Sequence, residues 1–189
     1  KGYLPEYGNR ARVRLGNGTD IDVVGGRAGQ EFHAFAVLEQ HTKLVAFEPH
    51  LHAPGTRMCI EAIWGSNHFT LNCVGYDHSW VKQYVYEDDA APLLPKGTIM
   101  HIVGFLDTTA GNENVADSRN WAGGGRRSVA NMFIDLGYSV ELTEEQFQSE
   151  MADRRAKMKS RNDYDIGCPL CWAPVPTEMT STTDDGGQQ

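Results

Sequence analysis

Residues 58–73 read MCIEAIWGSNHFTLNC and carry the clearest fold signal in the chain. Apolar and β-branched residues on both sides of residues 65–67 favour two strands joined by a turn. Cys59 and Cys73 are equidistant from Ser66, so a hairpin that turns there places them opposite each other. Opposed strand neighbours are close enough for a disulfide when the local geometry allows it. The alternative is a pair of buried, reduced thiols.

Most of the remaining chain predicts further strands on the same grounds. Runs rich in Val, Ile, Phe, Tyr and Thr, several of them alternating, are separated by glycine-containing turns. The expected strands are 10–15, 20–24, 31–39, 43–52, 57–64, 68–75, 81–87, 98–107 and 128–140. Many short strands with regular turns indicate an all-β fold, either a jelly-roll-like antiparallel β-sandwich or a barrel. We expect the sandwich.

The C-terminal part of the chain has a different pattern. Thr143 and Gln146 form a capping box and predict a helix over residues 144–160. Its thin apolar stripe is expected to dock on the edge of the domain or on a partner. The members of that stripe are Phe147, Met151 and Met158. The expected organisation is a β-sandwich domain at 1–142, a C-terminal helix at 143–161 and an irregular tail at 162–189.

Composition bounds the class of protein. The 189 residues are 40% apolar, enough for one domain with a real core. The formal net charge is -8, and an acidic chain is poorly suited to bind nucleic acid because phosphate neutralisation needs a basic face, so we set that class aside. The longest apolar stretches are too short to cross a bilayer. The chain begins at Lys1, which leaves room for a leader, an anchor or a preceding domain ahead of it.

The cysteines favour an oxidising, extracytoplasmic location, either periplasmic or secreted. Their number is even, and Cys59 and Cys73 are suitably placed to pair. Cys168 and Cys171 form a C-x-x-C in the irregular tail, where a local disulfide is expected. Zinc binding with an outside partner and redox activity are the alternatives. A haem attachment site is excluded because Trp172 stands where histidine is required.

His50 and His52 form the main candidate for a metal site. In an extended strand, residues i and i+2 point to the same face, so both rings can reach one ion. The alternative is two polar residues on the wet face of a strand. Met132 follows a long glycine-rich loop at about 107–127 and, taken alone, is more typical of core filling. A thioether added to two imidazoles would make a soft donor set that suits copper.

Several short segments, taken in order, resemble one family. They are residues 48–52 (EPHLH), 59–64 (CIEAIW), 76–80 (YDHSW), 93–98 (LLPKGT), 117–121 (DSRNW) and 128–132 (SVANM). Their order over about residues 10–150 resembles the C-terminal, M-site domain of the copper type II, ascorbate-dependent monooxygenases. This is the family of peptidylglycine α-hydroxylating and dopamine β-monooxygenases, and the chain looks closest to its bacterial relatives.

The resemblance implies a copper site and an oxygenase activity. By matching position, the implied copper ligands are His50, His52 and Met132, and the implied reaction is hydroxylation of a C–H bond with dioxygen. Two departures from the family pattern stand out. The family has a preceding domain whose three histidines hold an electron-supplying copper, and these 189 residues contain no counterpart of it. Residues 53–55 (APG) replace the charged residue that usually follows the H-x-H.

Two functions therefore stay open at this stage. One is an exported, copper-binding, monooxygenase-like domain. The other is a non-catalytic accessory subunit of an extracytoplasmic, membrane-associated redox or photosynthetic complex, with partners bound through the helix and tail. The other histidines are expected to be surface or core residues. Among them, His78 and His101 are the reserve candidates for the edge of a site.

Overall fold

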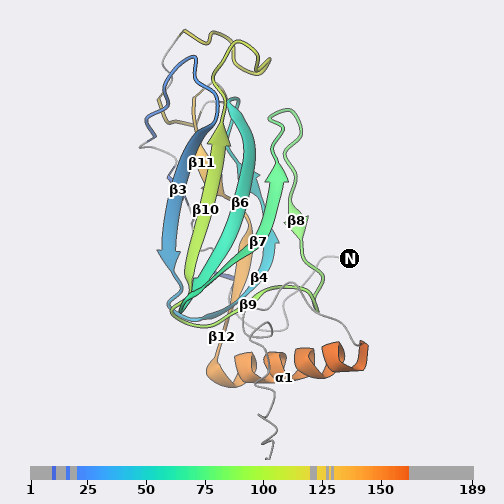
Figure 1. Cartoon of the computed structure of the whole chain (residues 1–189). Helices are drawn as coiled ribbons and strands as arrows, with labels where there is room; N and C mark the ends of the chain where they lie inside the picture. Colours follow the sequence, from blue (N-terminus) through green and yellow to red (C-terminus); the bar gives the residue numbers. More distant parts are fainter. Residues whose placement is uncertain are drawn as a thin grey trace, which may run out of the picture.

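A four-stranded antiparallel sheet forms one layer of the computed structural model, which describes residues 10–11, 16–17, 21–119, 123–126, 128 and 130–161. Its strand order is β3-β10-β6-β7 (Figure 1). The strands are β3 (Gln30–Val37), β10 (Ile99–Leu106), β6 (Gly55–Trp64) and β7 (Asn67–Gly75). Each pair is antiparallel, and β3 and β6 flank β10 over its whole length.

The second layer is built around β4 (His41–Phe47), behind the first sheet in Figure 1. Its other strands are β12 (Tyr138–Leu142), β8 (Tyr84–Val85), β9 (Leu93–Leu94) and β1 (Arg10–Ala11). A short third sheet has the order β2 (Gly16–Asn17), β11 (Phe133–Asp135) and β5 (Pro49–His50). All these ladders are antiparallel, so the predicted β-sandwich with one C-terminal helix is confirmed.

The apolar cluster shows which side of the four-stranded sheet faces the core. In β10, Met100 and Ile102 are almost completely buried, as is Ile60 in β6. They pack in one cluster with Leu44 and Phe47 of β4. The alternate positions point outward, because successive strand residues face opposite sides. The outer face therefore carries side chains that do not pack in this core cluster.

The hairpin of β6 and β7 differs from the expected one in its register. The turn has two residues, with Trp64 opposite Asn67, and a bulge follows between Ile60 and Glu61. The bulge restores the pairing of Cys59 with Cys73, and these two residues form the predicted disulfide. The strict symmetry about Ser66 was therefore wrong at the turn and right at the cysteines, because the extra bulge residue offsets the shorter turn.

Several predicted strands are shorter or broken. The strand expected at 43–52 is divided at Glu48 into β4 and β5, and the one expected at 128–140 is reduced to β11 and β12. Between residues 81 and 87 only Tyr84–Val85 is extended and paired, and residues 21–24 form no strand. Periodicity alone does not locate such breaks, since they depend on which neighbours pair with each segment.

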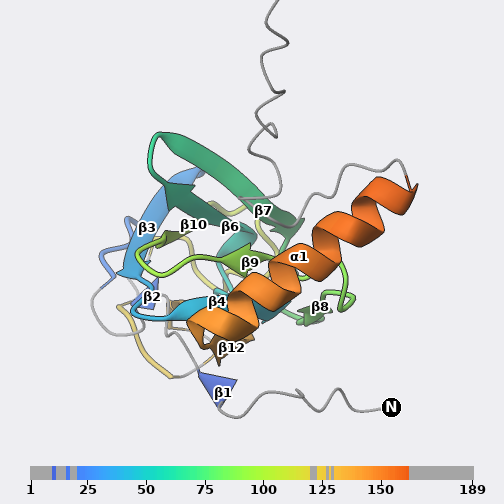
Figure 2. The ribbon, with the colours of Figure 1, turned by 90° about the horizontal axis from the view of Figure 1, so that it is seen from below.

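Helix α1 (Glu144–Arg161) begins at the predicted capping box. The Thr143 amide donates to Gln146 Oε1 at 2.9 Å, and the Gln146 amide donates to Thr143 Oγ1 at 3.3 Å. The helix lies across β4, β9 and β12 (Figure 2). Phe147 and Met151 are buried there in a second apolar cluster with Val45, Leu93, Val140 and Leu142. The helix therefore covers the outer side of the second layer of its own domain.

Buried cations fix the helix to the sheet. Lys43 of β4 is 2% exposed, and its Nζ donates to Asp88 Oδ1 at 2.6 Å and to Glu150 Oε1 at 3.1 Å. Burial by itself would lower the pKa of Lys43, but the two carboxylates offset this effect and the pKa is raised. Arg154 donates to the backbone carbonyls of Ala91 and Asp88. Asp88, in the acidic run at 87–89, thus contributes through its side chain and its backbone carbonyl to the contact with these buried cations.

Some expectations fall on residues outside the described ranges. These are the irregular tail at 162–189 with Cys168 and Cys171, and the part of the long loop that contains Trp121. In the part of the chain that the structure describes, no helix combines the length and apolar character that crossing a membrane requires.

Truncating Phe147 tests the packing of the helix. Phe147→Ala removes a ring that is 1% exposed, and we expect the free energy of unfolding to fall by roughly 3–5 kcal/mol. Ser149→Ala, on the exposed side of the helix, should change it by less than about 0.5 kcal/mol. Urea unfolding followed by circular dichroism measures both. Equal midpoints for the two variants would show that the helix does not stabilise the domain.

Candidate metal centre

His50 and His52 lie where a short strand ends and a sharp turn begins. His50 closes β5 and is paired with Ile134 of β11. His52 follows β5 with φ 62°, a left-handed conformation that no other non-glycine residue in the described ranges adopts. Such a conformation is uncommon for a bulky side chain and costs free energy that neighbouring contacts must offset. The Gly55 amide donates to the His52 carbonyl at 3.0 Å and closes the turn.

The turn brings three imidazoles close together. The ring centroids of His50 and His52 are 4.7 Å apart, with an angle of 77° between the ring planes. His78, from the turn after β7, has its centroid 6.2 Å from that of His52. The sequence suggested same-face positions on one strand for the first two rings, whereas the structure uses a bend at His52. It also places His78, a reserve candidate, beside them.

Two of these rings have a buried nitrogen that is available to bind a ligand. Nδ1 of His50 and Nδ1 of His78 are both buried and make no hydrogen bond within the described part of the chain. Native structures leave few buried polar atoms unsatisfied, and a bound ion is one explanation for such atoms. The metal-binding imidazole nitrogen is the one that carries the lone pair. The arrangement therefore fits a metal ion bound at these two ring nitrogens.

His52 is held by the backbone in a way that is typical of a metal ligand. Its Nδ1 lies 3.1 Å from the Ala130 carbonyl oxygen. A carbonyl only accepts, so Nδ1 carries the proton and Nε2 of the neutral ring carries the lone pair. Metal-binding histidines commonly donate their other N–H to a backbone carbonyl, which fixes the tautomer and the ring orientation.

The surroundings of His50 favour its neutral form. Burial lowers the pKa of His50, and the charges that His52 and His78 would carry lower it further. The neutral imidazole is the form that binds a metal. Protons therefore compete with a metal ion less strongly at His50 than at an ordinary histidine.

Met132 approaches the same turn from β11. Its backbone amide donates to the Leu51 carbonyl at 3.4 Å, and the residue is half-buried. Leu51 separates the two histidines in sequence, and Ile134, two residues after Met132, is paired with His50. The backbone of the third predicted ligand therefore lies beside the backbone that carries the first two.

Gly104 lets two large side chains pack closely against β10 beside the histidine turn. An ideal Cβ on Gly104 would lie 2.6 Å from Cδ2 of Phe133 and 2.9 Å from Cδ2 of Leu51. Side chains do not approach so closely, so the absent Cβ lets both residues pack directly on β10. Phe133 follows Met132, and Leu51 lies between His50 and His52. The contact thus fixes both candidate segments to the four-stranded sheet.

Asp135 fixes the strand that precedes the site. Its Oδ1 accepts from the Glu48 amide at 2.9 Å and from the Gly137 amide at 2.8 Å. The carboxyl is buried, and burial raises the pKa of Asp135 to about 6. The two amide donors oppose this rise, and the charge of Glu48 adds to it. Asp135 therefore connects the end of β4 with the start of β5 and the end of β11.

A surface hollow borders the histidine turn. It is lined on one side by Ala53, Pro54 and Asn131, and on the other by the loop at 114–117. Ala53 directly follows His52, and Asn131 directly precedes Met132. Ligand sites are usually concave, with few polar groups converging on them, and this hollow has that form beside the histidine turn.

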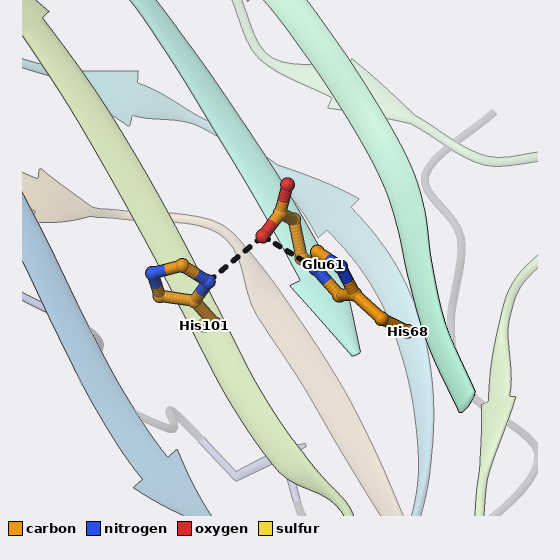
Figure 3. Close-up of side chains that lie close together, drawn as sticks. All are labelled: Glu61, His68 and His101. Carbon is orange, nitrogen blue, oxygen red and sulfur yellow. Dashed lines mark hydrogen bonds and ion pairs between the residues drawn. The ribbon is translucent and has the colours of Figure 1, made fainter. Parts of the chain in front are cut away.

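A second cluster of metal-binding side chains lies elsewhere, on the outer face of the four-stranded sheet. Glu61, His68 and His101 each offer one ligand atom there, and these atoms all lie within 4.8 Å of one another (Figure 3). Glu61 and His68 were not predicted as site residues from the sequence, and His101 was a reserve candidate for the edge of the other site. His101 is therefore in a different cluster from His78.

The hairpin register explains why this cluster was missed. Strict symmetry about Ser66 would pair Glu61 with Leu71 and Trp64 with His68, which puts Glu61 and His68 on opposite faces. In the structure the bulge pairs Glu61 with Thr70, and His68 is paired with Ile63. A shift of one residue moves a strand's side chains to the other face. No feature of the sequence marks that bulge, although the two-residue turn at Gly65-Ser66 implies it once Cys59 is paired with Cys73.

Comparison with known proteins adds no further assignment. No protein-family model matches the chain, and no curated protein matches it either.

The raised pKa of Asp135 predicts an unusual dependence of stability on pH. The folded state holds the Asp135 proton up to about pH 6, whereas an unfolded Asp releases it near 3.8. The folded state therefore binds more protons between these values, and the contribution of Asp135 falls by roughly 3 kcal/mol as pH rises through this window. Urea unfolding of the natural chain and of Asp135→Asn at several pH values should show the difference shrinking toward neutral pH.

Asp117→Asn is the control for this measurement. Hydrogen bonds from Arg119 lower the pKa of the exposed Asp117 carboxyl, so its contribution changes in the opposite direction, fading as pH falls. If Asp135→Asn and the natural chain showed parallel stability curves between pH 4 and 7, the carboxyl would not be buried as described.

Proposed function

We propose that this chain is a copper-binding domain whose ion is held at His50, His52 and Met132. The observation that carries the proposal is the convergence of the two imidazoles, with a buried Nδ1 on His50 that makes no hydrogen bond in the described ranges. The pKa of His50 is lowered by its surroundings, which favours the neutral, metal-binding ring. The strained backbone at His52 supports a functional role, since strain of this kind concentrates at functional sites.

The donor set favours copper over other metals. Two imidazole nitrogens and a thioether sulfur are softer than the oxygen donors that magnesium and calcium require. The thioether in particular favours copper(I), the state that reacts with dioxygen. When bound, copper would supply the activation of dioxygen for the hydroxylation of a C–H bond, the reaction that the resemblance to the ascorbate-dependent monooxygenases implies.

The residues of the chain itself would position the ion and the substrate. The Ala130 carbonyl orients His52, and the packing on Gly104 fixes the segments that carry all three ligands. The hollow beside Ala53 and Asn131 would receive the substrate. The hollow is lined mainly by uncharged residues and by one carboxylate, Asp117.

The proposed location is periplasmic or secreted. The Cys59–Cys73 disulfide is compatible with an oxidising compartment, where such bonds form and persist. There, a monooxygenation would need electrons from an external donor.

A second candidate is the non-catalytic accessory subunit of an extracytoplasmic complex. It is favoured by the apolar residues on the outer face of the four-stranded sheet, where Phe35 is 61% exposed and Val37 is 62% exposed. In the C-terminal helix, by contrast, Phe147 and Met151 are buried against its own domain. Partner binding would therefore use the sheet face more readily than the helix. Dioxygen consumption by the copper-loaded chain with ascorbate separates the two candidates.

Copper binding by single-site variants tests the main proposal. The natural chain should bind one equivalent of copper(I). His50→Ala and His52→Ala should each weaken binding by more than the 10–100-fold that the loss of an outer-shell contact costs. Met132→Leu, which keeps the volume but removes the sulfur, should weaken copper(I) binding more than copper(II) binding. Competition with a copper(I) chelator measures copper(I) binding, and equilibrium dialysis measures copper(II) binding.

His41→Ala is the matched control, because His41 is paired with one carboxylate, Glu144, at 2.7 Å and lies outside the site. His78→Ala reports whether the third ring contributes to binding. If the natural chain took up no copper, or if the His50 and Met132 variants bound it like the natural chain, the proposal would fail.

A further inference from the structure

The outer face of the four-stranded sheet carries a second group of metal-binding side chains, apart from the histidine turn. Glu61 of β6 is directly opposite His101 of β10, and His68 of β7 is two register positions from Thr70, the partner of Glu61 in the neighbouring ladder. Figure 3 shows the Glu61 carboxylate between the two rings, with both rings turned toward it. Three adjacent strands therefore contribute one side chain each to a single point on the sheet.

The distances in this cluster are short. Nε2 of His68 donates to Oε2 of Glu61 at 2.7 Å, and Nδ1 of His101 donates to the same oxygen at 2.8 Å. Thr70 Oγ1 lies 3.5 Å from the other oxygen, Oε1. One carboxylate oxygen thus faces two imidazole nitrogens at once. An ion that replaces the two shared protons would need only small movements of the exposed His68 ring.

His101 has the outer contacts of a metal ligand. Its Nε2 lies 3.0 Å from Nδ1 of His33, and its ring stacks on Phe35 with the centroids 4.2 Å apart and the planes 3° apart. If Nδ1 of His101 bound a metal, Nε2 would carry the proton and donate it to His33. Such a hydrogen bond from the second ring nitrogen is the usual support of a metal-binding histidine.

The strands around the cluster are rigid. His101 is at the third position of β10, which is paired on both sides along its length. Glu61 is two residues from Cys59, whose disulfide to Cys73 links β6 and β7. The bulge before Glu61 is what brings His68 to the same face. Sites on rigid strands hold their ligands more precisely than sites on loops.

We propose that Glu61, His68 and His101 bind one zinc ion. Two imidazole nitrogens and one carboxylate oxygen, without sulfur, are a common zinc ligand set, and three protein ligands leave a fourth position for water or an outside donor. Entry of the ion is open, because the His68 side chain is 56% exposed. Glu61 and His101, at 13% and 11%, provide the sheltered side of the site. This site is independent of the proposed copper centre.

Zinc titration of the full chain tests the proposal, with zinc alone as the probe. Equilibrium dialysis with metal analysis should find a zinc ion that is lost in His68→Ala and Glu61→Gln, with affinity reduced more than 100-fold. His33→Ala should weaken it about 10–100-fold by removing the acceptor behind His101. His68 and His33 are largely exposed, so these two variants should fold, and circular dichroism checks that they do.

Two controls separate this site from others. His41→Ala removes a histidine paired with only one carboxylate and should leave zinc binding unchanged. His50→Ala should also leave it unchanged, whatever its effect on copper. The proposal is overturned if the natural chain binds no zinc, if His68→Ala and Glu61→Gln bind it like the natural chain, or if the bound zinc is lost only in His50→Ala.

Discussion

The packing of Phe133 and Leu51 on Gly104 holds the short third sheet against β10 where the histidine turn lies. Without a Cβ at this point of β10, two large side chains reach the strand backbone, and their own neighbours in sequence are Met132, His50 and His52. Close packing of this kind transmits small displacements, because interiors have little spare volume. The geometry of the candidate copper centre therefore depends on a glycine that contributes no ligand.

The sequence predicted the elements whose pattern is local. The alternating strand β3, the apolar strand β10, the disulfide-linked hairpin and the capped helix α1 all carry signals within their own residues. The break of β4 at Glu48 is different, because it depends on Asp135, far away in sequence, which binds the Glu48 amide. Such long-range pairing is not visible in a window of neighbouring residues, so the continuous strand at 43–52 was the natural expectation.

The two clusters show the same limit at the level of sites. His50 and His52 could be proposed because they are two residues apart, although a left-handed residue, and not strand periodicity, brings their rings together. Glu61, His68 and His101 come from three strands, and their meeting depends on one bulge. Side chains from different strands become predictable only when the register is known, since one residue of slip reverses the face.

The ligand atoms of the two proposed sites would only partly determine which metal each site binds. A nitrogen and oxygen site binds copper(II) more tightly than zinc, following the general order of divalent metals. The outer cluster would therefore hold zinc only where copper(II) is scarce or is kept reduced. Copper(I) prefers soft sulfur, which Met132 offers and the outer cluster lacks. A reducing supply of copper thus directs each ion to its own site, whereas oxidised copper in excess would occupy both.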